Sequence, residues 1–245
     1  MVGRRKYDQG CAVAHALDLV GERWALLVVR ELVLGPKRFT DLASGLPGAS
    51  PDVLTQRLKE LTAAGVTRRR RLPAPAASWV YELTGWGAEL APVLVGLARW
   101  SSRSPDMPYD APLSTDSLML SLMALFDPSA DPGFEAVVDV DLGQQRFRLT
   151  VADGRLAVSR DARSRDGMEA RDGVESRDGV ARDRRPVDAV LDTDQDTLLA
   201  LLRTDAPLAE AVDSGALRLS GDPAVVERFR HLFPLPEPVP AAEPA

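Results

Sequence analysis

Residues 50–84 read SPDVLTQRLKELTAAGVTRRRRLPAPAASWVYELT, and this stretch decides the fold of the first half of the chain. Ser50 followed by Pro51 predicts a helix start, because a serine side chain caps free amides and proline fits the first helical position. Gly65 predicts the helix end. The apolar residues between them recur at helical spacing and form one stripe: Leu54, Leu58 and Leu61.

The opposite face of this predicted helix is polar and only partly charged. It comprises Asp52, Thr55, Gln56, Lys59 and Thr62, with Arg57 at the edge of the apolar stripe. Glutamine can pair with an adenine edge, and threonine can contact a phosphate or a thymine methyl. An ordinary solvated face is the other interpretation of the same pattern.

A positively charged hairpin follows the helix. Residues 66–72 and 78–83 predict two strands around the turn Pro73–Ala77, and the first strand carries Arg68, Arg69, Arg70 and Arg71. Since successive side chains of a strand point to opposite faces, the four arginines divide two and two. A basic hairpin directly behind an amphipathic helix fits DNA, with the helix in a major groove and the hairpin along the phosphates.

The flanking sequence predicts the remaining helices of a winged helix-turn-helix. Residues 11–20 predict one helix, 22–34 a second, a third begins at Phe39 with Thr40 as its cap and ends at Gly45, and 85–102 follow the hairpin. The side chains expected inside the first two helices are Val13, Leu17, Val20, Trp24, Leu27, Val28 and Leu32.

The helix at 85–102 has a broad apolar face that one small domain has little room to bury. We therefore predict a homodimer, and dimeric readers match two half-sites on DNA. The predicted dimerisation residues are Cys11, Val13, Leu17, Leu90, Val93, Leu94, Leu97 and Trp100.

Residues 10–102 resemble the HxlR family of bacterial winged-helix transcription regulators. The resemblance rests on the segments CAVAHALDLVGERW (11–24), LLVVREL (26–32), RFTDL (38–42), LTQRLKEL (54–61) and YELTGWG (81–87). It implies a dimer that binds double-stranded operator DNA, with 48–58 as recognition region and 68–79 as wing. One departure is the wing turn, which carries no charge and argues against a deep minor-groove contact at its tip. The predicted DNA-binding residues are Arg38, Thr40, Ser50, Asp52, Thr55, Gln56, Arg57, Lys59, Arg68, Arg69, Arg70, Arg71 and Ser78.

Charge is divided unevenly between the two halves. Residues 1–104 contain 15 basic and 9 acidic residues, whereas the whole chain has 30 and 36, so the remainder contains 15 and 27. The basic half suits a polyanion, and the acidic half is expected to lie away from DNA.

Composition sets the outer limits. With 245 residues, 45% of them hydrophobic, the chain can form two domains. A single cysteine excludes an intrachain disulfide framework and fits a reducing cytoplasm. No transmembrane run, metal-ligand cluster or catalytic motif is present in the sequence, so we expect a cytoplasmic protein that is neither an enzyme nor dependent on a cofactor.

Beyond a linker at 103–112, the second half alternates short strands and helices. A helix is predicted at 115–126, strands at 136–141, 146–151, 155–159, 187–191 and 217–219, and further helices at 194–202, 207–214 and from Asp222. The Asp153-Gly154 pair is a hairpin signal.

This half, residues 113–233, resembles the sterol-carrier-protein-like fold through DTD (192–194), LLALL (198–202) and the segment SGALRLSGDP (214–223). The predicted class is therefore α+β, with a winged helix-turn-helix followed by a sheet that has helices on one side. The resemblance implies a tunnel for an apolar small-molecule effector; a closed, filled core is the alternative. The candidate lining residues are Leu118, Leu122, Phe126, Val138, Phe147, Leu149, Leu198 and Leu202.

Two segments look irregular. An Arg-Asp-Gly unit repeats every six residues from Arg165 within 160–186, which predicts a low-complexity insertion. The proline-rich tail at 234–245 predicts disorder.

Cys11 has two interpretations. It is either a small residue packed at a helix start or a redox switch, because a helix N-terminus lowers a thiol pKa and some members of the resembled family sense oxidants here.

Three hypotheses follow: a ligand-responsive DNA-binding regulator, a regulator whose C-terminal half only assembles the protein, and a carrier of apolar ligands with vestigial DNA binding.

Overall fold

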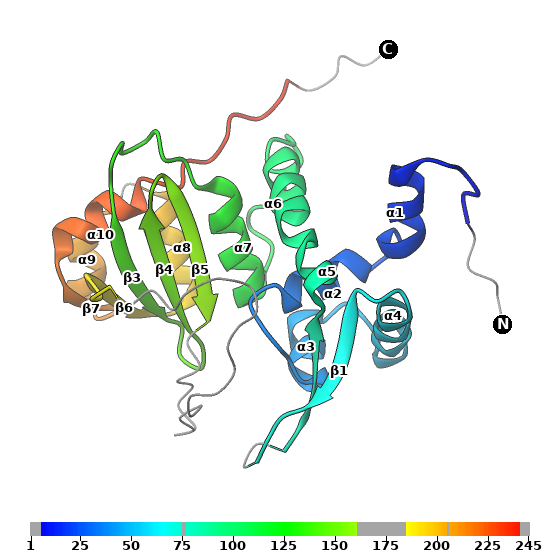
Figure 1. Ribbon diagram of the computed structural model, residues 1–245. Helices are drawn as coiled ribbons and strands as arrows, with labels where there is room; N and C mark the ends of the chain where they lie inside the picture. The colour runs from blue at the N-terminus through cyan, green and yellow to red at the C-terminus, as the bar shows by residue number, and fades with distance from the viewer. Residues whose placement is uncertain (1–5, 75–76, 161–184, 205, 241–245) are drawn as a thin grey trace. The chain divides into compact units, whose positions relative to one another are not determined.

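The computed structural model describes residues 6–74, 77–160, 185–204 and 206–240, and the chain forms two compact units (Figure 1). Unit 1 comprises Met1–Leu97 and Pro112–Leu118, and unit 2 comprises Ala98–Ala111 and Met119–Ala245. Unit 1 is helical with one β-hairpin, and unit 2 is built on a five-stranded sheet. The predicted mixed α+β class is confirmed.

Unit 1 contains the helices and hairpin of a winged helix-turn-helix. Its elements are α1 (Ala12–Val20), α2 (Ala25–Leu32), α3 (Phe39–Gly45), α4 (Pro51–Ala63), β1 (Thr67–Arg71), β2 (Trp79–Leu83), α5 (Gly85–Ala88) and α6 (Leu90–Ser101), the last of which continues beyond Leu97 into unit 2.

The core of unit 1 forms around the predicted stripe of α4. Leu54, Leu58 and Leu61 are each exposed by 1% or less, as predicted, and α4 packs against α2. Val28 of α2 and Leu42 of α3 are fully buried. This packing fixes which face of α4 is left for solvent, because the three leucines occupy one side of a helix of 3.6 residues per turn.

Several side chains predicted to lie inside the first two helices are instead exposed. Val13 and Leu17 of α1 are 69% and 45% exposed, and Leu27 of α2 is 36% exposed. The helix α2 starts only at Ala25, since Trp24 takes a left-handed conformation with φ of 76°. The core face of α2 is formed by Val28, Val29, Glu31 and Leu32.

Two predicted boundaries are also wrong. Thr40 is not the cap of α3: Arg38 is the N-cap residue, and its backbone N–H donates to Asp41 Oδ2 at 3.1 Å. The helix predicted at 85–102 is two helices with a break at Glu89. Thr84 starts the first of them, since its side chain accepts a hydrogen bond from Gly87 N at 3.0 Å.

Unit 2 contains a sheet in the order β5-β4-β3-β6-β7, in which only the β3–β6 pair is parallel. The helices α8 and α10 lie on one side of this sheet in Figure 1. The elements are α7 (Thr115–Leu125, which starts in unit 1), β3 (Ala136–Asp141), β4 (Arg146–Ala152), β5 (Arg155–Arg160), β6 (Ala189–Thr193), α8 (Gln195–Arg203), α9 (Leu208–Asp213), β7 (Leu217–Gly221) and α10 (Pro223–Arg230).

The alternation of residues in the strands gives this sheet one apolar and one polar face. Val138 pairs with Leu149 on the apolar face, whereas Asp139 pairs with Arg148 on the other, where their side chains form an ion pair at 2.8 Å. The predicted turn at Asp153-Gly154 joins β4 to β5 with positive φ at both residues, as a two-residue hairpin requires.

Two predicted segments fall wholly or partly outside the described residues. The Arg-Asp-Gly repeats fall within 161–184, outside the described residues. Of the proline-rich tail, residues 234–240 are described, and Val239 N–H donates to the carbonyl of Arg103 at 2.8 Å within unit 2.

Candidate nucleic-acid interface

The exposed face of α4 is held in place from its first turn. Ser50 Oγ accepts a hydrogen bond from Val53 N at 3.3 Å, and Pro51 follows at the first helical position. With the leucine stripe buried, Thr55, Gln56 and Lys59 are all exposed. Asp52 is exposed in the first turn, where its charge complements the helix dipole.

Arg57 differs from its neighbours on α4. Its guanidinium lies 2.6 Å from Glu60 and 3.4 Å from Glu22, and its side chain is only 15% exposed. Glu60 also accepts a hydrogen bond from Gln56 Nε2 at 2.7 Å. The exposed face that can meet a base edge therefore consists mainly of Thr55, Gln56 and Lys59.

The arginine row of β1 divides into two pairs, as the alternation of a strand predicts. Arg68 and Arg70 flank one carboxylate: each donates from Nε to a different oxygen of Glu82, both at 2.7 Å. Glu82 lies directly opposite Arg68 on β2 and is 8% exposed. Half of the positive charge of the row is thus partly compensated within the hairpin.

Arg69 and Arg71 occupy the other face of the hairpin. The guanidinium of Arg69 lies 4.5 Å from the ring centroid of Trp79, and Arg71 Nε donates to the carbonyl of Ala77 at 3.2 Å. Neither forms an ion pair with any acid among the described residues. Within the described residues these two guanidinium groups are not compensated by an acid, and one of them packs against the exposed ring of Trp79.

The hairpin is joined to the start of α3 by side chain and backbone. Arg38 Nε donates to Ser78 Oγ at 3.2 Å. The preceding residue, Lys37, pairs antiparallel with Tyr81 through two backbone hydrogen bonds of 3.0 and 2.8 Å. Arg38 is therefore next to the wing, and Thr40, two residues further along, is exposed.

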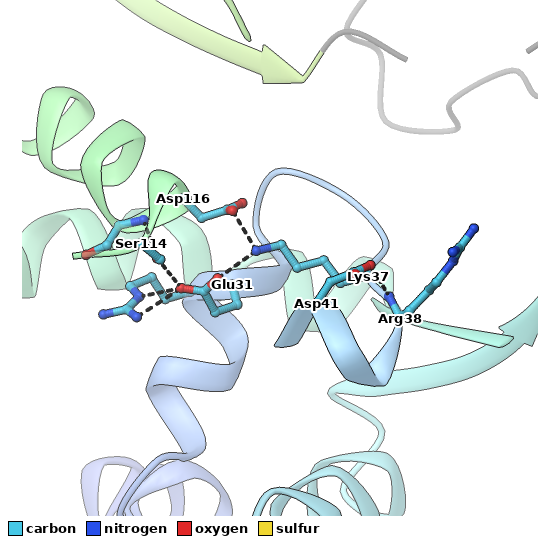
Figure 2. A network of polar contacts seen from close by, with 8 residues as sticks. Glu31, Lys37, Arg38, Asp41, Ser114 and Asp116 are labelled. Carbon is cyan, nitrogen blue, oxygen red and sulfur yellow. Dashed lines mark hydrogen bonds and ion pairs between the residues drawn. The ribbon is translucent and has the colours of Figure 1, made fainter. Parts of the chain in front are cut away.

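A buried charge network lies behind this surface, and we did not predict it from the sequence (Figure 2). Lys37 Nζ is 2.6 Å from Glu31 Oε2 and 2.6 Å from Asp116 Oδ2. The one available signal was Glu31 itself, a charged residue on the apolar side of α2. Lys37 lies beyond the end of α2, and Asp116 is 79 positions from Lys37, so helical spacing does not reveal these partners.

The predicted dimerisation residues are mostly exposed. Val93, Leu97 and Trp100 on α6 are 57%, 44% and 75% exposed, whereas Leu94 is buried within the chain. Cys11 is an exposed free thiol at the N-cap of α1. The backbone amides of Ala14 and Val13 lower its pKa, the first being the larger cause.

The candidate ligand-lining residues mostly fill the core of their part of the chain. Leu118, Leu122, Val138, Phe147, Leu149 and Leu198 are exposed by 3% or less. Phe126 lines a hollow together with Phe134, Val151 and Leu232, with a cavity volume of about 10 Å³. That is room for about one water molecule.

Two further findings concern the described residues only. No group of three or more His, Cys, Asp or Glu side chains among them is placed to hold a metal ion. None of their helices combines the length and the apolar character needed to cross a membrane.

A capped helix packed on a helix-turn-helix core, with a basic two-stranded wing, defines a winged helix-turn-helix DNA-binding domain. The sequence model of the HxlR-like helix-turn-helix family matches residues 19–107. The chain belongs to the HxlR-like helix-turn-helix family. Members of this family are DNA-binding transcriptional regulators rather than enzymes, so the expectation that the chain is not an enzyme is confirmed.

Two relatives support this assignment by their sequences. The HTH-type transcriptional regulator YvaP of Bacillus subtilis is 38% identical over 87 residues, which span 36% of this chain and 81% of the relative. The regulator sll1512 of Synechocystis is 37% identical over 92 residues, 38% of this chain and 68% of the relative. The solved structure of the reduced transcriptional regulator YodB from B. subtilis is 30% identical, with a TM-score of 0.35, and covers 42% of this chain and 100% of that one.

Proposed function

We propose that the protein is a dimeric, sequence-specific transcriptional regulator. In this proposal α4 contacts the bases of operator DNA, and the wing binds the flanking phosphates. The observation that carries this proposal is the exposed Thr55–Gln56–Lys59 face beside the basic hairpin, on the scaffold of a regulator family. Base contacts from α4 would provide sequence choice, and the arginines would provide general affinity.

The double variant Gln56→Ala/Lys59→Ala is expected to abolish the gel shift of a duplex taken from upstream of the protein's own gene. The loss follows because it removes an amide able to pair with adenine and a cation next to it. Arg218→Ala removes an exposed cation from unit 2 and serves as the control, with an unchanged shift expected.

An unchanged shift in the double variant would contradict the role of α4. If the wild-type protein shifts no duplex, the third hypothesis, a carrier with vestigial DNA binding, is favoured instead.

For assembly we propose that Val13, Leu17, Val93, Leu97 and Trp100 pack against a second copy of the chain. Their support is exposure: each is at least 44% exposed although apolar. Val93, Leu97 and Trp100 also share one side of α6 by their helical spacing, and an exposed apolar stripe of this kind marks an interaction site. For unit 2 the buried candidate residues support a filled core and an assembly role. An apolar effector that shifts the spacing of the two α4 helices remains the alternative.

Native mass spectrometry tests both points on the purified protein. The wild type is expected to appear as a dimer, and Val93→Asp/Leu97→Asp as a monomer, because charge cannot be buried at an apolar interface without a partner. Leu235→Asp changes an apolar residue of similar exposure elsewhere and should leave the dimer intact. A monomeric wild type contradicts the proposal, and a small molecule retained by unit 2 would favour the effector.

A second candidate function, redox sensing, is favoured by one observation at Cys11. The thiol is exposed, and the backbone amides of Ala14 and Val13 at the start of α1 lower its pKa. A lowered pKa increases the thiolate fraction near neutral pH, and the thiolate is the reactive form.

The rate of Cys11 alkylation by iodoacetamide is expected to rise with pH. The midpoint of this rise should lie at a lower pH in the folded protein than in the same chain unfolded in urea. Peroxide should then produce a dimer on non-reducing electrophoresis, which Cys11→Ser abolishes, together with a change in DNA binding. Equal midpoints in folded and unfolded protein, or crosslinking without any effect on DNA binding, would rule out the switch.

A further inference from the structure

The ammonium group of Lys37 is enclosed by two carboxylates in the interior of unit 1 (Figure 2). The side chains of Lys37, Glu31 and Asp116 are 6%, 0% and 1% exposed, and both Nζ–oxygen distances are 2.6 Å. Glu31 Oε1 also accepts hydrogen bonds from Ser114 Oγ at 2.5 Å and Arg30 Nη2 at 2.9 Å. Among the described residues, two cations and two carboxylates thus share one network.

This network depends on every member. Charges removed from water are tolerated only when they are paired, and loss of one partner leaves a buried charge without compensation. Glu31 comes from α2, Lys37 from the segment before α3, and Ser114 and Asp116 from the start of α7. The network therefore joins three separate segments of unit 1 through the side chain of Lys37 and its two carboxylate partners.

Lys37 is also the residue that joins the wing to the helix-turn-helix. Its backbone pairs with Tyr81 of β2 in both directions. Its neighbour Arg38 starts α3 and donates a hydrogen bond to Ser78, the residue before β2. The position of Lys37 consequently affects how α3 and the wing are placed relative to each other.

Two of the partners lie outside the part of the chain that the family match covers. That match ends at residue 107, whereas Ser114 and Asp116 come later, in the segment Pro112–Leu118 that clusters with unit 1. The helix α7 then continues through Leu125 into unit 2.

From this arrangement we infer that Asp116, supported by Ser114, is a positioning residue for DNA binding. It holds Lys37, and through Lys37 the wing and the start of α3, in the geometry that binds DNA. The DNA-binding unit of this protein accordingly extends to the first turn of α7. The inference rests on the proposed function, because it assigns a role to the same surface.

The test uses Asp116→Asn and Asp116→Asn/Lys37→Met in the full chain, bound to a random-sequence duplex and to the upstream duplex. The single variant leaves the network with one excess positive charge, so both its unfolding midpoint and its affinity should fall. We expect an affinity loss of about fivefold or more, within the range of couplings carried by such networks. The double variant is charge-balanced, so its midpoint should recover.

The double variant separates positioning from stability. If Asp116 positions Lys37, the double variant should still bind DNA at least about fivefold more weakly than wild type, although its unfolding midpoint has recovered. The reason is that the ion pair between Lys37 and Asp116 is still missing. If affinity recovers together with the midpoint, the network serves only stability and the inference is wrong. Wild-type affinity in Asp116→Asn overturns it as well.

Two controls complete the experiment. Asp196→Asn makes the same change at the second residue of α8 and should leave affinity unchanged. Should Asp116→Asn fail to fold, Ser114→Ala is the second variant. It removes the hydrogen bond to Glu31 and the one that Ser114 Oγ accepts from Ser117 N at 3.1 Å at the start of α7. About a twofold to threefold loss of affinity is expected, and no loss in the folded variant contradicts the inference. A wild-type protein that binds neither duplex refutes the proposed function instead.

Discussion

Replacing Arg69 and Arg71 together by alanine is expected to weaken binding to a random-sequence duplex by about tenfold at low salt and to flatten its salt dependence. Each phosphate contact contributes about 0.9 to the slope of log affinity against log salt concentration, so the slope should fall by about 1.8. These two arginines are chosen because no acid among the described residues forms an ion pair with either. The measurement is fluorescence anisotropy over a series of salt concentrations.

The matched control removes two exposed arginines from unit 2, Arg155 and Arg218, and lowers the net charge equally. It should leave the slope unchanged, since the effect depends on contact and not on total charge. The variant Arg68→Ala/Arg70→Ala is not equivalent to Arg69→Ala/Arg71→Ala, because it removes both arginine partners of the Glu82 carboxylate. Glu82 is only 8% exposed. Equal slopes for wild type and Arg69→Ala/Arg71→Ala would show that this face of the wing does not contact phosphates.

Gly45→Ala is expected to destabilise unit 1 by about 3 kcal/mol, the cost of disturbing a buried ion pair. A Cβ at Gly45, the last residue of α3, would lie 2.3 Å from Glu31 Oε2 and 2.8 Å from Glu31 Cδ. Glu31 cannot move away freely, since Lys37, Arg30 and Ser114 all hold its carboxylate. Helix propensity alone would predict the opposite sign, because alanine is favoured over glycine within a helix.

Urea unfolding followed by tryptophan fluorescence measures this effect, because Trp24, Trp79 and Trp86 all lie in unit 1. Gly85→Ala, at the first residue of α5, is the control: a Cβ there meets open space, so stability should be unchanged or higher by up to about 1 kcal/mol. An unfolding midpoint for Gly45→Ala equal to that of wild type would mean that Glu31 shifts at little cost.

The local features were predictable because their causes lie close together in sequence. Ser50 caps α4 three residues ahead of the amide it accepts from, and the leucines of α4 recur within two turns. The Asp153-Gly154 turn needs only its own two residues to take positive φ. The identity of the wing strands follows from the same short-range alternation.

The missed features depend on residues far apart in the chain. Glu31 is 6 positions from Lys37 and Asp116 is 79 positions from it. No helical or strand period predicts that the three side chains come together. The exposure of Val13 and Leu17 depends on what packs against α1, which an apolar pattern does not specify. The shared partner of Arg68 and Arg70 was not predicted, because it depends on the strand register that places Glu82 opposite Arg68 and within reach of both side chains.

The sequence alone was enough to predict a winged helix-turn-helix followed by a sheet with helices, because caps, periods and turns are local and repeat within a few residues. The family followed from the resemblance of five short segments. Only the tertiary structure decided which charges face solvent and which are paired. Whether an arginine can meet a phosphate depends on where distant carboxylates come to lie, as Glu82 shows for the wing and Asp116 for Lys37.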